Sequence, residues 1–412
     1  MTRISFRGAA ASDAEAICQV LRSVSDLRAD DPAWEQRRGA IASSAWQWRV
    51  GIADGRILTV VQAAPSAVWF GRSRIRWADV GDVSVVPELQ GRGLGSQAMT
   101  DVVEWMRAAG YAVTRLGGLT RFYSRFGYQS FPRQYVEFPV YRTIRAGALR
   151  LPFPETIKPA FEYDGQVRSF DEQRDAPGAW EVAETFTLHR TGCRVFERPA
   201  PGSLSGRPAV VFEQGGRVRG IAAYRIYHDE VSAYEAKVTA YQLAYEPGCP
   251  EALDALVKHL LRLAYSEGAG RLTALLPPDD AMVADLGRLG GAWNLCQTSE
   301  QVAGNMIQIL SLRALLECIE DELSDRAGRV AWRGSVCLDI DRERAALAVE
   351  RGTVALANTQ DAEVTISMSQ AEMLRMVLGI MPPVWPAKVA PDHPAYAAMA
   401  ALFPPLSGGF NT

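Results

Sequence analysis

The sequence predicts a mixed α/β fold, with α+β character, built from two similar mixed-sheet units and a third, smaller α+β unit. Two hairpin signals carry this prediction, because Asp54-Gly55 and Gly215-Gly216 each separate two runs of strand-forming residues. After each hairpin come another strand, a loop, a helix and a further strand, so the second unit resembles a degenerate copy of the first. A helix followed by short strands near the C-terminal end forms the third pattern.

The elements of the first unit follow from local patterns. Ser12 and Glu15 form a capping-box pattern before the apolar residues of a first helix, and Pro32 suits the first turn of a second helix. A third helix follows a glycine-rich loop and ends near Gly110, with its apolar residues on one face. A short helix is predicted around residues 122–128. The predicted strands cover about residues 4–6, 48–53, 56–62, 67–71, 80–86 and 111–116.

The other two units are interpreted in the same way. The stretch 142–159 contains three prolines and no clear period, so the first boundary is placed there. Ser369 and Glu372 predict the start of a late helix, and Phe403 and Phe410 indicate that the apolar tail packs against the rest of the chain. The predicted domains are residues 1–145, 146–300 and 301–412. The remaining predicted strands cover about residues 208–214, 218–227, 234–245, 271–276, 329–340, 345–350, 354–357 and 363–368, with helices at about 250–266 and 312–323.

Length and composition exclude several classes of protein. The chain has 412 residues, of which 48% are hydrophobic and 22% charged, so it is globular and too long for one core. A net charge of -3 gives no general attraction to nucleic acid or to an anionic membrane. No apolar run approaches the roughly 20 residues that span a bilayer, and the N-terminus lacks the apolar core of a signal peptide. The scattered cysteines and histidines favour a cytoplasmic protein with reduced thiols and no metal site.

The loop between the predicted strand at 80–86 and the following helix is the first candidate for a binding site. It contains three glycines, whose missing side chains let backbone N–H groups converge, and the helix N-terminus adds a partial positive charge. This arrangement predicts an anion site suited to a pyrophosphate. A dinucleotide-binding fold is disfavoured because several strands precede the loop, and a tight turn without a ligand is the alternative. The candidate residues are Gln90, Gly91, Arg92, Gly93, Leu94, Gly95 and Ser96.

Two motifs in this unit resemble those of the GNAT acetyltransferase superfamily. Gln90-x-x-Gly93-x-Gly95 resembles that family's pyrophosphate motif, (Arg/Gln)-x-x-Gly-x-(Gly/Ala). The segment 122–128, Phe-Tyr-Ser-Arg-Phe-Gly-Tyr, resembles its second signature, (Phe/Tyr)-Tyr-x-x-x-Gly-(Phe/Tyr). The resemblance implies acetyl-CoA as co-substrate, with its pantetheine arm on the backbone of Val83 and Val85. It also implies that Tyr123 is the general acid that protonates the departing thiolate, whereas Tyr128 is interpreted as a packed aromatic residue.

The whole chain resembles a narrower group, the Eis (enhanced intracellular survival) acetyltransferases. These proteins combine a functional GNAT domain, a degenerate GNAT-like domain and a C-terminal sterol-carrier-protein-like domain. The resemblance implies N-acetylation of a primary amine on a small molecule, and a homo-oligomer that is a hexamer in many members. It also implies that the terminal carboxylate, on Thr412 here, acts as the base. This sequence has two residues after Phe410, whereas a C-terminal aromatic residue is common in that family.

Two further residues are candidates for binding the amine. Asp26 falls where Eis-like proteins line their substrate pocket with acid, and an acid there would attract a cationic amine; a loop or cap aspartate is the alternative. Trp34 either lines that pocket or anchors a helix. In the second unit, the segment 246–251 lacks the glycine loop and contains two prolines, which have no N–H to donate. We therefore expect no CoA there.

Two other functions stay open. Aminoacyl transfer from charged tRNA also uses paired GNAT units, but the nearly neutral charge and the intact first glycine loop argue against it. The C-terminal domain could instead act as a non-catalytic lipid or small-ligand carrier, which requires an open apolar tunnel. We expect a small-molecule amine as the partner, and neither nucleic acid nor a membrane.

Overall fold

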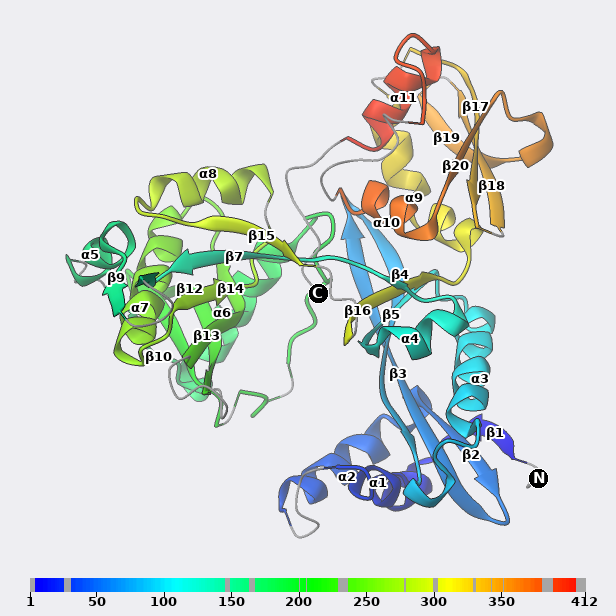
Figure 1. Ribbon diagram of the computed structural model, residues 1–412. Helices are drawn as coiled ribbons and strands as arrows, with labels where there is room; N and C mark the ends of the chain where they lie inside the picture. The colour runs from blue at the N-terminus through cyan, green and yellow to red at the C-terminus, as the bar shows by residue number, and fades with distance from the viewer. Residues whose placement is uncertain are drawn as a thin grey trace.

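The structure, a computed structural model, folds into three lobes that meet near the middle of the molecule (Figure 1). Two lobes contain a larger mixed sheet each, and the third contains a small sheet covered by helices. The predicted mixed α/β class is thereby confirmed. The structure describes residues 4–25, 31–144, 149–162, 167–199, 201–204, 206–228, 236–277, 279–298, 303–328, 331–341, 343–350, 352–379 and 388–404.

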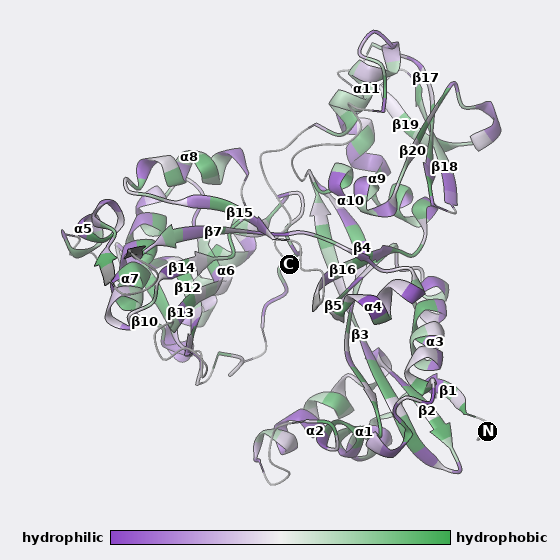
Figure 2. Ribbon diagram, viewed as in Figure 1, coloured by the Kyte–Doolittle hydropathy of each residue, from purple (hydrophilic) through white to green (hydrophobic). Residues whose placement is uncertain are grey.

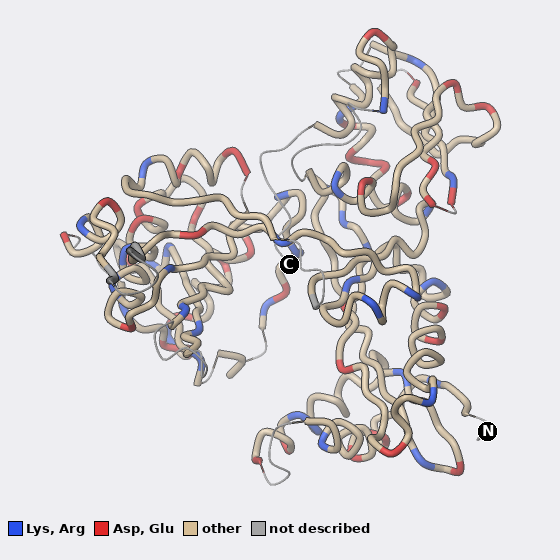
Figure 3. The backbone as a smooth tube through the Cα atoms, in the orientation of Figure 1, with Lys and Arg blue, Asp and Glu red and all other residues tan. Residues whose placement is uncertain are grey.

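Each lobe contains charged residues of both signs. Acidic and basic residues are interspersed along the backbone rather than gathered in one part of it (Figure 3). Within the described ranges, no helix combines the length and the apolar character needed to span a bilayer.

The first sheet contains strands of the N-terminal unit and one strand from much later in the chain. Its order is β1-β2-β3-β4-β5-β16-β6, and every neighbouring pair is antiparallel except β4 and β5. The strands are β1 (Ser5–Gly8), β2 (Trp48–Ala53), β3 (Arg56–Phe70), β4 (Ser73–Val85), β5 (Val113–Leu119), β16 (Ala303–Ile309) and β6 (Gln129–Ser130).

Helices cover both faces of this sheet. Val60 packs in a core with α1 (Ala14–Arg22) and α2 (Ala33–Ser43), whereas its neighbour Val61 packs in a core with α3 (Leu94–Ala108). Successive strand residues point to opposite faces, so α1 and α2 lie on one face and α3 on the other. Hydrophobic residues accordingly run along the central strands (Figure 2).

The first hairpin forms as predicted, but the strand after it is longer. Asp54 and Gly55 have φ angles of 50° and 73°, as a two-residue turn between β2 and β3 requires. The two strands predicted at 56–62 and 67–71 are one continuous strand, β3. Pro65 is tolerated within it because β2 pairs only as far as Gln62, so no ladder bond to β2 is lost at the proline.

The second sheet repeats the architecture of the first. Its order is β10-β11-β12-β13-β14-β7-β15, with a parallel pair at β13 and β14. The helix predicted at 250–266 is α7 (Pro250–Ser266), and it packs in the core of this lobe. The strands are β10 (Val167–Ser169), β11 (Ala209–Gln214), β12 (Arg217–His228), β13 (Ala236–Tyr245), β14 (Arg271–Ala274), β7 (Arg133–Pro139) and β15 (Asn294–Thr298). The lobe also contains the hairpin β8 (Tyr141–Ile144) and β9 (Leu149–Pro152), and the helices α5 (Pro154–Glu162), α6 (Glu172–Thr187) and α8 (Asp280–Arg288).

The two large sheets exchange strands. β7 comes from the predicted first domain but pairs with β14 and β15 of the second sheet. β16 follows the predicted second domain but pairs with β5 along its whole length, from Val113 opposite Ile309 to Leu119 opposite Ala303. The domain boundaries at about residues 145 and 300 stay a prediction. Strands cross them: β7, from the first predicted domain, joins the second sheet, and β16, from the third predicted domain, joins the first sheet.

The third lobe packs directly on the first. Its sheet has the order β19-β18-β17-β20, and its core also contains Phe70, Ile75 and Trp77 from β3 and β4. Ser369 and Glu372 form the predicted capping box, and Phe403 is buried against Phe70, as expected for a packed tail. Phe410 lies outside the described residues. The elements are α9 (Leu312–Ala327), β17 (Gly334–Ile340), β18 (Glu343–Glu350), β19 (Thr353–Ala357), β20 (Val364–Met368), α10 (Gln370–Val377) and α11 (Pro394–Leu402).

All three lobes meet at the turn between β3 and β4. The Gly71 N–H donates to Thr191 Oγ1 of the second lobe, at 2.8 Å. The Arg72 N–H donates to Glu322 Oε2 on α9, at 2.9 Å, and Arg326 Nε donates to Glu322 Oε1, at 2.8 Å. The Arg326 guanidinium also lies 4.1 Å from the centre of the Phe70 ring. Glu322 therefore ties the turn to the third lobe.

We predict that Glu322→Ala destabilises the chain by about 3 kcal/mol, because two donors lose a largely buried charged acceptor. Urea unfolding of the full chain measures this change. Asp321→Ala is the matched control, because Asp321 is exposed on the same helix and surface changes usually stay within about 0.5 kcal/mol. Equal stability of the two variants would contradict the role of Glu322.

Candidate active site

The site begins where β4 leaves β5. The two strands pair only over four residues each, from Trp77 opposite Val113 to Val80 opposite Leu116. Beyond this point β4 bulges, because Val61 of β3 faces two residues of β4 between the pairs Val60–Ser84 and Gln62–Gly81. A bulge bends a strand and re-aims it, so the ends of β4 and β5 diverge and leave a gap in the sheet.

One of the bulged residues, Asp82, has the unusual backbone conformation that this bend requires. Its φ is 50°, a left-handed value that aspartate tolerates better than most residues. The Asp82 carboxylate accepts a hydrogen bond from Arg37 Nη2 on α2, at 2.6 Å. The bulge is therefore tied to the helix pair on that face of the sheet.

The gap continues into a cavity of about 720 Å³. Its walls come from the end of β4, the glycine-rich loop, the end of β5 and the short helix α4 (Thr120–Tyr123). Of the residues predicted to bind acetyl-CoA, all but Arg92 line this cavity, and Arg92 is exposed on the loop. The lining residues are Val24, Val83, Ser84, Val85, Leu89, Gln90, Gly91, Gly93, Leu94, Gly95, Ser96, Gly118, Leu119, Phe122, Tyr123 and Arg125.

The glycine-rich loop presents the N-terminus of α3 to the cavity. Gly91 and Gly93 have φ angles of 72° and 83°, and Gly93 is the residue before the first turn of α3. A β-carbon at either glycine would meet nothing within 4 Å, so the space in front of the helix is open. The first N–H groups of a helix have no partner within it, and here they face a cavity that an anion can enter. Gln90 Nε2 donates to the Val85 carbonyl, at 3.1 Å, and so holds the loop against β4.

Tyr123 lies on the opposite wall. Its half-buried ring meets Phe122 edge-on, with 4.9 Å between ring centres. A β-carbon at Gly118 of β5 would lie only 2.6 Å from Tyr123 Cε2, so the ring needs glycine at that position. Burial raises the pKa of Tyr123 above the ordinary value, so the phenol keeps its proton at neutral pH.

Arg125 is a member of the site that sequence reasoning did not single out. Its Nη2 donates to Ser96 Oγ in the first turn of α3, at 2.5 Å, and its guanidinium lies 5.0 Å from the centre of the Phe122 ring. This places a cation beside the helix N-terminus. The only sequence signal was its position within the Tyr123 motif.

Two apolar residues at the mouth of the cavity were also missed. Leu119 is 62% exposed and Val24 is 39% exposed, although both are hydrophobic. A leucine at the end of a strand and a valine after a helix are usual core residues, so no pattern in the sequence distinguished them.

Some predicted residues lie elsewhere. Trp34 is only 2% exposed and packs with α1, and the guanidinium groups of Arg22 and Arg37 lie 5.4 and 5.7 Å from the centre of its ring. It is not among the residues that line the cavity, which favours its interpretation as a helix anchor. Asp26 and Thr412 lie outside the described residues. Tyr128 is buried and shares a hydrogen bond with Thr114 Oγ1, at 3.2 Å, as its interpretation as a packed residue requires.

The corresponding place in the second lobe carries a buried tyrosine. β13 and β14 also pair over a short stretch and then separate. Tyr245, at the end of β13, is buried there and donates its hydroxyl to Asp285 Oδ2 of α8, at 2.7 Å. α7 then begins after a buried cysteine, Cys249, with Pro250 in its first turn. In the part of the chain that the structure describes, no cluster of His, Cys, Asp or Glu side chains is arranged to hold a metal ion.

Comparisons with known proteins agree with this geometry. Residues 5–131 match the family model described as an acetyltransferase (GNAT) domain. No match was found among curated protein sequences. The probable N-acyltransferase from Enterococcus faecalis V583 is 15% identical, with a TM-score of 0.66 over 98% of this chain and 97% of that one.

Two further solved structures are similar over nearly the full length. The GCN5-related N-acetyltransferase from Kribbella flavida is 17% identical, with a TM-score of 0.61 over 99% of this chain and 96% of that one. Eis1 from Mycobacterium abscessus is 18% identical, with a TM-score of 0.58 over 98% and 97%. At these identities the likeness shows the fold, and the acetyltransferase domain match supports acyl transfer as the general class of activity.

Proposed function

We propose that the protein is an N-acetyltransferase that moves an acetyl group from acetyl-CoA to a primary amine of a small molecule. The observation that carries the proposal is the cavity between the diverging ends of β4 and β5. It joins the open helix N-terminus at Gly93 to the protonated phenol of Tyr123. A thioester with a phosphorylated carrier needs both an anion site and, some distance away, a proton donor.

The walls of the cavity suit different parts of acetyl-CoA. The pyrophosphate would lie at the N-terminus of α3, where the backbone N–H groups and the helix dipole favour anions. Arg125 adds a positive charge on the same side. The pantetheine arm contains amides, and the part of β4 that has parted from β5, at Val83 and Val85, offers backbone groups to pair with them.

Transfer then requires three tasks from this chain. The amine nitrogen attacks the thioester carbon, and a backbone N–H of the parted β4 stabilises the oxyanion that forms. The carbon–sulfur bond breaks, and Tyr123 donates its proton to the sulfur. A base takes the proton that the amine loses. We propose the carboxylate of Thr412 for this task, by resemblance to the Eis acetyltransferases, and Asp26 as an acid that attracts the cationic amine.

We predict that Gly93→Asp abolishes acetyl-CoA binding, because a carboxylate before α3 repels the pyrophosphate. Isothermal titration calorimetry measures the affinity, and it should find one site per wild-type chain because α7 of the second lobe begins at Pro250 without a glycine-rich loop before it. Gly55→Asp is the matched control, since Gly55 also has a positive φ with open space around it but lies in the β2–β3 turn. Unchanged affinity in folded Gly93→Asp protein would refute the anion site. Two sites per chain would refute the expectation that the second lobe binds no CoA.

We predict that Tyr123→Phe lowers kcat by about 10²–10⁴-fold, the usual contribution of a general acid, with acetyl-CoA affinity unchanged. A thiol-release assay with an accepted amine measures this effect. Because its pKa is raised, the phenol of the wild type should stay protonated through the neutral range, and activity that depends on it should decline only when it ionises above about pH 10. Tyr111→Phe, at another partly buried tyrosine, is the control. Wild-type kcat in Tyr123→Phe would exclude the general-acid role.

We predict that removing residues 410–412 abolishes turnover while acetyl-CoA still binds, because the base is lost and the anion site is kept. The same assay and calorimetry test this. Normal turnover in the shortened chain would show that another group accepts the proton.

By resemblance to the Eis acetyltransferases, many of which are hexamers, we also propose that this protein is a homo-oligomer. Analytical ultracentrifugation measures its oligomeric state.

A further inference from the structure

The third lobe holds the end of the short helical segment that contains Tyr123. α4 continues into a 3-10 turn, Ser124–Phe126, which ends at Gly127. Gln370 Nε2, at the start of α10, donates to the Gly127 carbonyl, at 2.5 Å. Its Oε1 accepts from the Ile309 N–H at the end of β16, at 2.9 Å. One amide side chain thus joins the helical segment to the strand beside β5.

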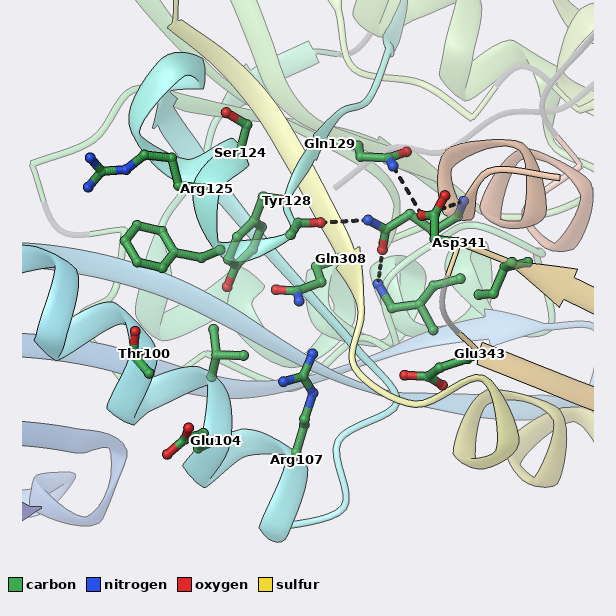
Figure 4. Close-up of a pocket in the computed structure, with 16 residues that line it drawn as sticks. Thr100, Glu104, Arg107, Ser124, Arg125, Tyr128, Gln129, Gln308, Asp341 and Glu343 are labelled. Carbon is green, nitrogen blue, oxygen red and sulfur yellow. Dashed lines mark hydrogen bonds between the residues drawn. The ribbon is translucent and has the colours of Figure 1, made fainter.

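A second set of hydrogen bonds supports this link. Gln129, two residues after Gly127, accepts from the Ala371 N–H at Oε1, at 3.2 Å. Gln129 Nε2 donates to Asp341 Oδ2, also at 3.2 Å. Figure 4 shows Gln129 pointing toward Asp341, with a dashed line for the hydrogen bond between them. The contacts come from two separate parts of the third lobe.

The position of Gln370 is fixed by its own surroundings. It is only 8% exposed. It follows Ser369, whose side chain accepts from the Glu372 N–H, while Glu372 accepts from the Ser369 N–H, at 2.8 Å. This capping box sets where α10 begins, and it therefore fixes the residue that reaches Gly127.

The helical segment is also held from the side of α3, because Arg125 donates to Ser96 Oγ and Phe126 packs against the core that α3 helps to form. Residues 124–127 also line a cavity of about 870 Å³, together with residues of α3, β16 and the third lobe (Figure 4). α4 and the 3-10 turn are a single turn each, too short to be stable alone. Gly127 has a φ of 95°, and a β-carbon there would lie 2.6 Å from Gln308 Nε2, so the segment ends tightly at this glycine.

We propose that Gln370 is a positioning residue for Tyr123, so that the third lobe sets the geometry of the catalytic wall. Tyr123 lies one helical turn before Gly127, and its ring meets the ring of Tyr128 on the other side of that glycine, with 6.3 Å between centres. A shift at Gly127 therefore reaches Tyr123 through both backbone and ring. This inference rests on the proposed role of Tyr123 as the general acid.

The test removes the hydrogen bonds of the Gln370 side chain and leaves the residues of the acetyl-CoA cavity unchanged. Gln370→Met keeps the length of the side chain but loses both hydrogen bonds, and Gln370→Glu loses the donor to Gly127. We expect each to lower kcat about tenfold, since misplacement of about 1 Å can cost up to 10²-fold. Calorimetry should give an unchanged acetyl-CoA affinity. Gln360→Ala, at an exposed glutamine of the same lobe, should leave kcat unchanged. If both Gln370 variants unfold, Gln129→Ala tests the neighbouring hydrogen bonds.

A double-mutant cycle distinguishes a role of Gln370 in positioning Tyr123 from a general disturbance of the structure. In the Tyr123→Phe background, Gln370→Met should cause no further loss of kcat, because the donor that it positions is already gone. A tenfold loss that persists in that background, or a silent Gln370→Met beside a costly Tyr123→Phe, would overturn the inference and leave the proposed function intact. A silent Tyr123→Phe would overturn the general-acid role, and the inference with it.

Discussion

The separation of two neighbouring strands is the constraint on which the site depends. β4 must leave β5 to open the cavity, yet both must stay in one sheet. The bulge at Asp82 bends β4 away, and β16 pairs with β5 along its full length, so β5 keeps a complete partner on its other edge. β5 therefore stays in the sheet although one of its edges is open at the gap, because β16 pairs with its other edge.

The second lobe has the same architecture with different residues at the corresponding place. Tyr245, at the end of β13, is buried and bonds to Asp285, and a proline and a buried cysteine begin the helix where the first lobe has glycines. It accepts β7 into its sheet, and it supplies Thr191 to the turn at Gly71 where the lobes meet.

Sequence patterns predicted the elements that short segments determine. The turn at Asp54-Gly55, the helix Pro250–Ser266 and the capping box of Ser369 all follow from residues close together in the chain, and the glycine loop and Tyr123 do come to one cavity. The exchange of β7 and β16 was not predictable in this way, because strand pairing between distant segments leaves no periodic signal. Trp34 shows a similar limit: a tryptophan suits a pocket wall and a core equally well, and only the packing of α1 and α2 decides between them.

The exchange of strands also bears on how the protein is made. The ribosome releases β5 long before β16, so the first sheet cannot close until residue 309 has emerged from the exit tunnel. Until then the outer edge of β5 is open and able to pair with other chains. The region that matches the acetyltransferase domain, residues 5–131, ends before both β7 and β16. Expressed as a fragment, it would keep both motifs but lack β16, the strand that covers the outer edge of β5.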